Sequence, residues 1–301
     1  MPPKKRKKLY FQKKRESSHG RNPRELRGKY DISFWKKYKR ENPCPKNLQL
    51  ARKLKVENYF HNIEKVMLSQ SSYNIAISCC TQHFNSLLLA AFEDARGFPY
   101  DNPMVYSRTR GWVAQSLCPY SRQNNRVHFG LCTKHENGKC LMPAYPRPHE
   151  SGTSKFNKMT HMTRSVYELT QILGKLVGVD LNLCIYNYYN AAKKERINMH
   201  SDTQTKNPKE IAHAQNTPVV SITIKGEMNF NVHANRMDKV GKVLVKLNNK
   251  NIFVWGYEDD QVQYHSVTFE DGSEESRECF VLRKLQKFAY FDTNGNGCTH
   301  L

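Results

Sequence analysis

Three residues in the second half of the chain, two histidines and an aspartate, have the side chains and the spacing of a metal site. His200 and Asp202 stand two residues apart, and His265 follows an apolar run further along. Two imidazoles and one carboxylate can hold a mononuclear non-haem iron on one face of its octahedron. The three remaining positions then accept a bidentate oxo-acid and O2. A His-x-Asp pair alone is weak evidence, so the assignment depends on what accompanies it.

Two downstream arginines supply a clamp for such an oxo-acid. Arg277 lies twelve residues after His265, and Arg283 lies six residues after Arg277 in an apolar segment. An even spacing puts both side chains on one face of a strand. A guanidinium binds a carboxylate through two charge-assisted hydrogen bonds, which is what a buried dicarboxylate cosubstrate requires.

The elements that must position these residues are short strands. After Gly178, short apolar or alternating segments separated by polar linkers favour a sandwich or a barrel. Before Gly178, apolar residues recur at helical spacing over 84–92 and, most clearly, over 159–177, where Gly178 ends the predicted helix. The predicted strands are 183–189, 219–224, 230–232, 243–247, 252–255 and 279–282.

In chain order, these motifs resemble the AlkB family of Fe(II)- and 2-oxoglutarate-dependent dioxygenases. The resemblance covers residues 105–285 and is most specific in the last hundred of them. The matching segments are 187–189 (Asn-Tyr-Tyr), 200–202 (His-Ser-Asp), 217–222 (Thr-Pro-Val-Val-Ser-Ile), 254–256 (Val-Trp-Gly), 264–267 (Tyr-His-Ser-Val) and 277–283 (Arg-Glu-Cys-Phe-Val-Leu-Arg).

The resemblance implies an α+β fold with a double-stranded β-helix core of the jelly-roll or cupin type and flanking helices. The apolar pattern before residue 105, and not the resemblance, predicts a mainly helical N-terminal extension. It implies that Fe(II) is held by His200, Asp202 and His265, and that Arg277 pairs with the distal carboxylate of 2-oxoglutarate. O2 would be the second cosubstrate, and ascorbate would serve as reductant in vitro. The residues implied to bind the other polar groups of 2-oxoglutarate are Arg283, Asn187 and Tyr189.

The resemblance also implies a nucleic-acid base as substrate. Gly111-Trp112 looks like part of the family's nucleotide lid, where an aromatic ring and the first iron-binding histidine sandwich the base; the alternative for Trp112 is an ordinary core indole. Gln204 stands where the family often carries an acid that reads the base edge, and Cys279 replaces an asparagine between the two arginines. A neutral amide cannot favour a cationic alkylated base by charge. A neutral methylated base is therefore as consistent as alkylation damage.

The net positive charge of the chain also favours a nucleic-acid partner. The chain of 301 residues holds 48 Lys and Arg against 27 Asp and Glu, a net charge of +21, and residues 1–28 hold eleven basic and two acidic residues. Such a surplus favours a phosphate-bearing partner. The run Lys4-Lys5-Arg6-Lys7-Lys8 resembles a nuclear localisation signal, which predicts an import receptor and the nucleus; the alternative is a nonspecific nucleic-acid-binding tail. No apolar run approaches the ~18 residues of a membrane span, so we expect no membrane partner.

We expect a disordered basic tail at 1–28, a mainly helical region at 29–104, the dioxygenase domain at 105–287 with a lid at about 105–158, and a tail at 288–301. Nine cysteines, an odd number, favour a reducing compartment with free or metal-bound thiols. One cluster has zinc-ligand residue types, but its spacing is not that of a standard knuckle and favours free thiols in the lid. Its members are Cys118, Cys132, His135 and Cys140.

Three functions remain open at this point. The first is oxidation of a methyl group on a base of DNA or RNA, by demethylation or by hydroxylation, with a TET/JBP-like 5-methylcytosine oxidase as a close alternative. The second is a protein hydroxylase or demethylase with the same iron chemistry. The third is a binding module that has lost turnover. The complete triad and both arginines disfavour the third, and the basic charge favours the first over the second.

Overall fold

The computed structural model describes the chain in several stretches, all within one compact unit, Cys44–Leu301. The predicted boundaries at 104/105 and 287/288 fall inside this unit. The predicted basic tail and its localisation signal lie outside the described residues. For 104–107, 111–114 and 298 only the backbone is described. The described residues are 54–100, 104–107, 111–114, 125–145, 156–202, 216–292, 294–295 and 297–298.

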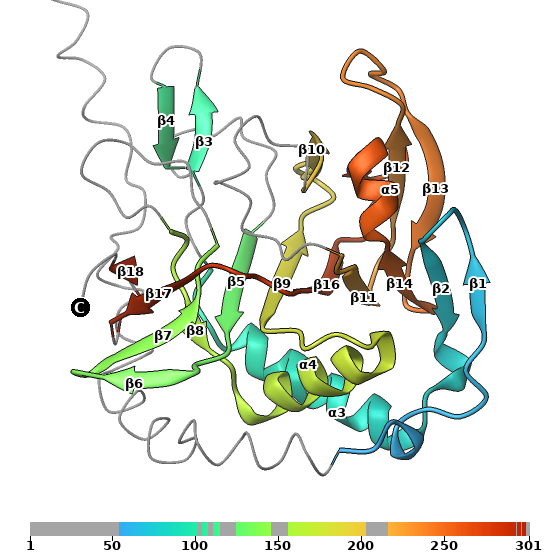
Figure 1. The fold of residues 1–301 in the computed structure, drawn as a ribbon. Coiled ribbons are helices and arrows are strands. Elements are labelled where there is room, and N and C mark those ends of the chain that lie inside the picture. Colours follow the sequence, from blue (N-terminus) through green and yellow to red (C-terminus); the bar gives the residue numbers. More distant parts are fainter. Residues whose placement is uncertain are drawn as a thin grey trace, which may run out of the picture. The chain divides into compact units, whose positions relative to one another are not determined.

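Two sheets form the core of this unit (Figure 1). The larger has the strand order β1-β2-β14-β11-β16-β9-β5-β8, and the smaller has the order β10-β15-β12-β13. All pairs are antiparallel except β5 with β8. The strands are β1 (Lys65–Met67), β2 (Tyr73–Ala76), β5 (Asn125–Gly130), β8 (Thr160–His161), β9 (Leu183–Tyr189), β10 (Ile197–His200), β11 (Val219–Lys225), β12 (Met228–His233), β13 (Lys242–Leu247), β14 (Asn251–Trp255), β15 (Tyr264–Thr268) and β16 (Arg277–Arg283).

The winding of β9 to β16 is that of a double-stranded β-helix. Consecutive strands alternate between the larger and the smaller sheet, except at the β12–β13 hairpin. Apolar side chains from both sheets pack together between them, among them Tyr189, Phe230, Phe253, Trp255 and Val267. The predicted α+β fold with a jelly-roll core is confirmed, and each of the six predicted strands lies within one of these eight.

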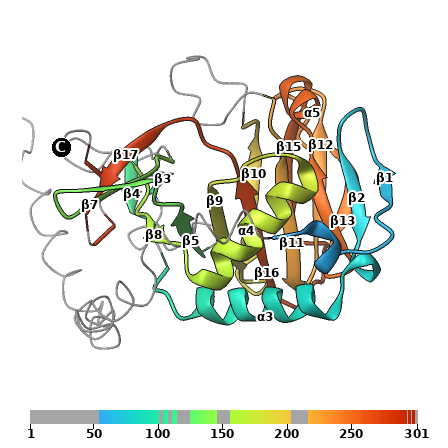
Figure 2. The ribbon, with the colours of Figure 1, turned by 60° about the horizontal axis from the view of Figure 1, so that its bottom comes forward.

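Two helices, α3 (Gln82–Arg96) and α4 (Arg164–Val177), lie against the outer face of the larger sheet (Figure 2). The apolar stripe predicted around Phe84 is the buried face of α3. Phe92 on this helix packs edge-on against Tyr186 of β9 and Phe280 of β16, with ring centroids 5.8 Å and 6.5 Å apart. The helices therefore close the larger sheet on the side away from the smaller one.

Helix α4 begins later than the predicted 159–177. The Thr163 hydroxyl accepts a hydrogen bond from the Val166 amide at 3.2 Å and caps the first turn. Of the residues before the cap, Thr160 and His161 form β8 instead. At the other end, Gly178 adopts the left-handed conformation with φ of 73° and donates to the Gly174 and Lys175 carbonyls, which stops the helix as predicted.

Several strands lie where none was predicted. In the region expected to be mainly helical, β1 and β2 extend the larger sheet beyond β14, with Ile75 fully buried. In the region expected to be a tail, Phe291 of β17 is also fully buried and pairs with Cys140 of β7. In both regions the apolar residues form strands that pair with a neighbouring strand, β2 with β14 and β17 with β7. The remaining elements are η2 (Val56–Asn58), η3 (Ile77–Cys79), β3 (Met104–Ser107), β4 (Gly111–Ala114), β6 (Lys134–Glu136), β7 (Lys139–Pro143), β17 (Phe288–Phe291), β18 (Gly297–Cys298) and the short helix α5 (Tyr257–Val262).

The strands β18, β17, β7 and β6 form a second four-stranded sheet in that order, and β3 pairs with β4. None of the helices in the described part of the chain is both long and apolar enough to cross a membrane.

Candidate metal centre and cosubstrate pocket

The three predicted metal ligands come together at one end of the smaller sheet. His200 is the last residue of β10 and pairs across the sheet with His265 of β15, and Asp202 follows two residues later. His200 Nε2 lies 3.8 Å from Asp202 Oδ1, and His265 Nε2 lies 4.0 Å from Asp202 Oδ2. One ligand atom of each residue lies within 4.8 Å of the other two. A single ion bonded to all three would fit this spacing.

The Nδ1 atom of each imidazole ring lies close to an oxygen. His200 Nδ1 lies 2.9 Å from the Asn198 carbonyl oxygen, and His265 Nδ1 lies 3.2 Å from Asp260 Oδ1. A proton on Nδ1 leaves the lone pair on Nε2, the nitrogen that faces Asp202 in both rings. Burial, together with the neighbouring His265, lowers the pKa of His200 although Asp202 acts in the opposite direction. The donor set of two neutral imidazoles and one carboxylate fits Fe(II).

Asp260 is a site residue that the sequence did not reveal. It is 2% exposed and lies in α5, and its Oδ1 accepts hydrogen bonds from the Trp255 indole at 3.0 Å and from the Asp202 amide at 3.3 Å. Its Oδ2 accepts from the Ser201 hydroxyl at 3.2 Å. Burial would raise the pKa of Asp260, but His265 and Trp255 outweigh it and the pKa lies below its ordinary value. One ionised carboxylate thus orients both His265 and the backbone that carries Asp202.

Asp260→Asn is expected to weaken metal binding by about 10- to 100-fold, the usual cost of losing an outer carboxylate that orients a ligating histidine. The affinity for Mn(II), measured by electron paramagnetic resonance, tests this. The matched control is Asp259→Asn, because Asp259 is equally buried but accepts hydrogen bonds from Ser69, Ser71 and Ser72 instead. Equal loss of Mn(II) affinity in both variants would show that Asp260 acts only through the stability of α5.

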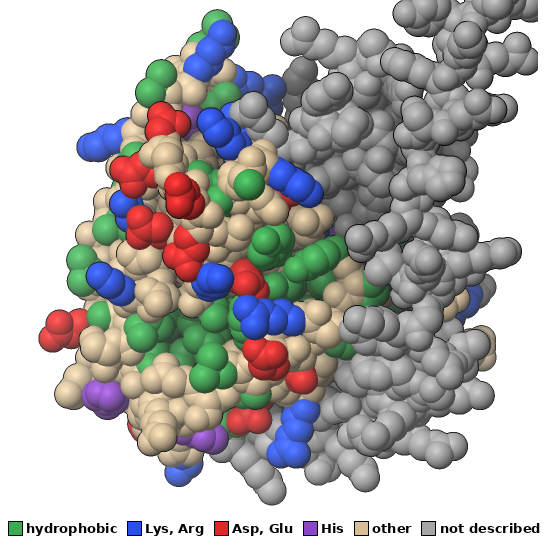
Figure 3. All heavy atoms as spheres, turned by 180° about the vertical axis from the view of Figure 1, so that it is seen from behind, with side chains coloured by type: hydrophobic (Ala, Val, Ile, Leu, Met, Phe, Trp, Pro, Cys, Tyr) green, Lys and Arg blue, Asp and Glu red, His purple; other side chains and the backbone are tan. Residues whose placement is uncertain are grey.

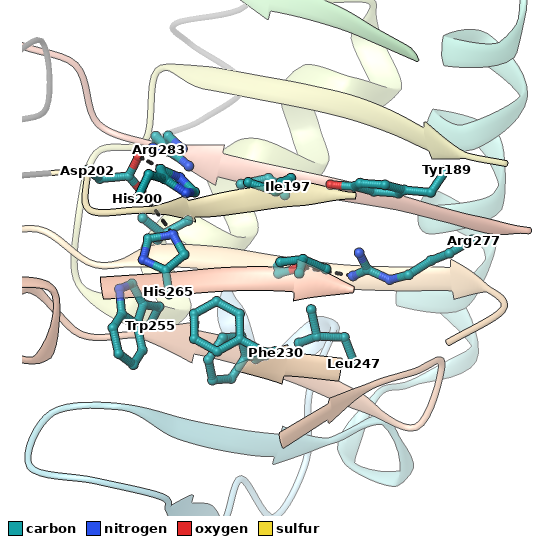
Figure 4. A pocket seen from close by; sticks show the side chains of 15 residues that line it. Tyr189, Ile197, His200, Asp202, Phe230, Leu247, Trp255, His265, Arg277 and Arg283 are labelled. Carbon is teal, nitrogen blue, oxygen red and sulfur yellow. Dashed lines mark hydrogen bonds and ion pairs between the residues drawn. The ribbon is translucent and has the colours of Figure 1, made fainter. Parts of the chain in front are cut away.

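A pocket of about 460 Å³, open space at its mouth included, runs from the metal ligands along the space between the two sheets (Figure 4). The triad and Arg283 lie at one end, and Tyr189 and Arg277 lie at the other. Both predicted clamp arginines therefore line one pocket. The lining between the two ends is mainly apolar; it consists of Ile197, Val219, Phe230, Leu247, Phe253, Trp255, Val267 and Val281, with the hydroxyl of Ser221.

Arg277 is a buried cation, 1% exposed. Its guanidinium donates to the Thr223 hydroxyl, from Nε at 3.1 Å and from Nη2 at 2.7 Å, and more weakly to the Ser221 hydroxyl at 3.4 Å. Among the described residues, no acidic side chain forms an ion pair with it. A buried charge that has only neutral partners is costly, and an anion bound beside it would remove much of that cost.

Arg283 is placed differently from Arg277. Its Nη1 lies 2.5 Å from Asp202 Oδ1, so it forms an ion pair with the carboxylate of the triad. Burial would lower the pKa of Arg283, but Asp202 outweighs this effect and raises it. The pair orients the Asp202 carboxylate. The role in binding 2-oxoglutarate that the resemblance implies for Arg283 stays a prediction.

The other two predicted cosubstrate residues differ in position. Tyr189, 1% exposed, lines the pocket beside Arg277, whose guanidinium carbon lies 5.6 Å from the centre of the tyrosine ring. Burial raises the pKa of Tyr189, so its hydroxyl stays protonated and can donate. Asn187, two residues earlier on β9, is buried but is not part of the lining, and its amide donates to the Ile185 carbonyl at 3.2 Å.

Some predicted residues lie outside the described part. Gln204 and Cys118 are among them, and for Trp112 only the backbone of β4 is described.

Two cysteines expected as free thiols are paired instead: Cys132 and Cys140 form a disulfide, with their Cα atoms 5.7 Å apart. The hairpin β6–β7 brings them together, which the spacing in the sequence did not reveal.

Comparisons with known proteins find a likeness only in structure. No protein-family model and no curated protein sequence matches the chain. A structure described as that of OsALKBH1 matches with a TM-score of 0.43 and 10% identity, covering 73% of this chain and all of that one. A prolyl hydroxylase from Trichoplax adhaerens, solved with a peptide fragment of the hypoxia inducible factor oxygen degradation domain, matches with a TM-score of 0.43 and 13% identity, covering 82% of this chain and 91% of the other.

Proposed function

We propose that this protein is an Fe(II)- and 2-oxoglutarate-dependent dioxygenase. The observation that carries the proposal is the buried Arg277, which closes one end of a pocket whose other end holds two histidines and an aspartate. A dicarboxylate that chelates a metal at the triad and reaches Arg277 would satisfy both ends. Fe(II) bound to this set supplies oxidation by O2 coupled to decarboxylation of 2-oxoglutarate.

The side chains around the pocket have separate tasks in this proposal. Arg277 and the Tyr189 hydroxyl hold the distal carboxylate, with Thr223 keeping the guanidinium in place. The apolar walls exclude water from the reacting atoms, which strengthens every electrostatic contact inside. Asp260 lies beside His265 Nδ1 and orients the ring, and Arg283 orients the Asp202 carboxylate.

We further propose a methylated nucleic-acid base as substrate and the nucleus as the site of action, with an import receptor bound at the basic N-terminus. The resemblance of Gly111-Trp112 to a nucleotide lid supports the substrate. The positive charge of the N-terminal segment also supports a nucleic-acid substrate. Residues 1–53 hold 19 basic and 4 acidic residues, whereas residues 54–301 hold 29 basic and 23 acidic residues. On the face seen in Figure 3, basic and acidic side chains are mixed. We therefore assign the main phosphate contacts to the N-terminal segment.

The substrate is tested by nucleoside mass spectrometry after incubation of methylated DNA and RNA oligonucleotides with Fe(II), ascorbate and 2-oxoglutarate. We expect loss of one methylated base, with release of formaldehyde from an N-methyl group or gain of one oxygen on a C-methyl group. Asp202→Ala is the inactive control. Binding should also weaken steeply with ionic strength, because phosphate contacts release counterions. Unchanged oligonucleotides together with oxygen added to a basic nuclear peptide would replace this substrate by a protein.

A further inference from the structure

A second group of metal-ligand side chains lies outside the pocket, at the hairpin β6–β7. Cys132, His135 and Cys140 each offer one ligand atom, and these atoms lie within 4.8 Å of one another. Cys132 and Cys140 are 4% and 2% exposed and belong to a buried apolar cluster, whereas His135 is exposed. None of the three lines the cosubstrate pocket.

The backbone brings these three residues together in a defined register. A two-residue turn, Asn137-Gly138, with φ of 48° and 73°, closes the hairpin and sets His135 opposite Cys140. Cys132 precedes the hairpin, and the next amide, that of Thr133, donates to the Leu141 carbonyl at 2.9 Å. Cys132 is thereby held against β7, with its Cα atom 5.7 Å from that of Cys140.

The candidate for a fourth ligand is His161 of the neighbouring strand β8. Strand β8 pairs in parallel with β5 so that His161 stands beside Gly130, two residues before Cys132. Its ring stacks on that of His135, with centroids 5.9 Å apart and an angle of 7° between the planes. Two imidazoles bound to one tetrahedral zinc through bonds of about 2.0–2.1 Å have centroids roughly 5 Å apart. His161 is not in the group whose ligand atoms lie within 4.8 Å of one another, and the two ring planes are nearly parallel. The His161 side chain must therefore move closer, and one of the two rings must turn, before both lone pairs point at one ion.

We propose that the reduced chain binds one Zn²⁺ through Cys132, His135, Cys140 and His161. Four protein ligands of this kind make a closed, tetrahedral, structural site. Binding replaces the two thiol protons by bonds to zinc and involves no oxidation. The two thiolates balance the charge of the ion, so the site is neutral, which suits its place beside the buried Met142.

The disulfide and the zinc site are alternative states of the same cysteines. A disulfide between Cys132 and Cys140 makes no use of the two imidazoles that lie beside it. The other cysteines whose side chains are described are free thiols, namely Cys79, Cys80, Cys184 and Cys279. In a compartment that keeps those thiols reduced, the zinc site forms; it fastens the hairpin β6–β7 to β5 and β8.

Cobalt(II) distinguishes this site from the triad, because only this site offers sulfur. The reduced full-length protein, titrated with Co(II) alone, should gain one equivalent of thiolate-to-cobalt charge-transfer absorption that Zn²⁺ then removes. Cys140→Ser should abolish the band. Asp202→Ala, which removes the other site, and Cys184→Ser, a matched control at a buried free thiol, should keep it. Absence of the band in the reduced protein, or its persistence in Cys140→Ser, would overturn the proposal.

The histidine ligands need a separate comparison. His135→Ala and His161→Ala should each weaken Co(II) binding at the sulfur site by at least about 100-fold, since each loses a direct ligand. His61→Ala, at an exposed histidine elsewhere, should leave it unchanged. Unaltered affinity in His161→Ala would remove His161 from the site. A zinc-free protein that keeps the Cys132–Cys140 disulfide in the presence of a thiol reductant would favour the disulfide as the native state.

Discussion

Alanine at any of the three triad positions is expected to abolish iron binding and turnover while the fold is kept. Each ligand supplies one of only three protein bonds, so the loss should exceed the cost of removing an orienting neighbour, that is, more than about 100-fold in metal affinity. His200→Ala is the cleanest of the three changes, because it leaves the ion pair between Asp202 and Arg283 in place and strands no buried charge. Asp202→Ala leaves Arg283 without the carboxylate it contacts, so some loss of thermal stability should accompany it.

Iron stoichiometry and 2-oxoglutarate decarboxylation are the measurements, and thermal melting reports the fold. The exposed His61→Ala again serves as a histidine control. Full decarboxylation by any of the purified triad variants would contradict the assignment of that residue. The expected outcome is a folded variant that lacks iron and cannot decarboxylate 2-oxoglutarate, with a lowered melting temperature for Asp202→Ala alone.

Arg277→Leu is expected to raise the KM for 2-oxoglutarate by about 10- to 100-fold, because a hydrogen-bonded charged group is worth about 1.5–3 kcal/mol. Without cosubstrate, the same change removes a buried cation whose side-chain hydrogen bonds, within the described part of the chain, go to hydroxyls. The melting temperature of the cosubstrate-free protein should therefore stay the same or rise. An increase in KM without a loss of stability would distinguish a clamp from a structural arginine.

Arg277→Lys gives the matched comparison, because it keeps the charge but loses the two-pronged geometry. Its KM should fall between those of the wild type and Arg277→Leu. Steady-state decarboxylation at saturating Fe(II) measures all three. If KM in Arg277→Leu stays within twofold of the wild type, the carboxylate is held elsewhere in the pocket.

The sequence predicted those strands and site residues that have a clear local pattern of residue types. Strand β9 was predicted over its full length, because seven consecutive residues are apolar, aromatic or amide and continue without a break. His200, Asp202 and His265 were found from residue types and their order, and the structure brings them within bonding reach of one ion. The even spacing of Arg277 and Arg283 placed both on one face of β16, and both line the pocket.

What the sequence hid depends on tertiary contacts. Glu258-Asp259-Asp260 reads as an ordinary solvated acidic run, yet the two aspartates are buried. Asp259 accepts a hydrogen bond from Ser72, and Asp260 accepts one from Trp255. The partial signal was their place three and four residues after Gly256 and shortly before His265. The proximity of His161 to the cysteine hairpin had no signal, because a parallel pairing of β5 with β8 creates it.

The pairing of β2 with β14 has a consequence for how the protein avoids self-association. Strand β14 contains Ile252 and Val254, which are fully buried. Without β2, β14 would be an apolar open edge of the larger sheet. Open edges of this kind recruit strands from other molecules. Here β2 covers the edge, and the outermost strand β1 has only three residues, one of them Lys65. A chain cut at residue 105 would keep the triad and both arginines, but it would expose β14 and be prone to aggregate edge to edge.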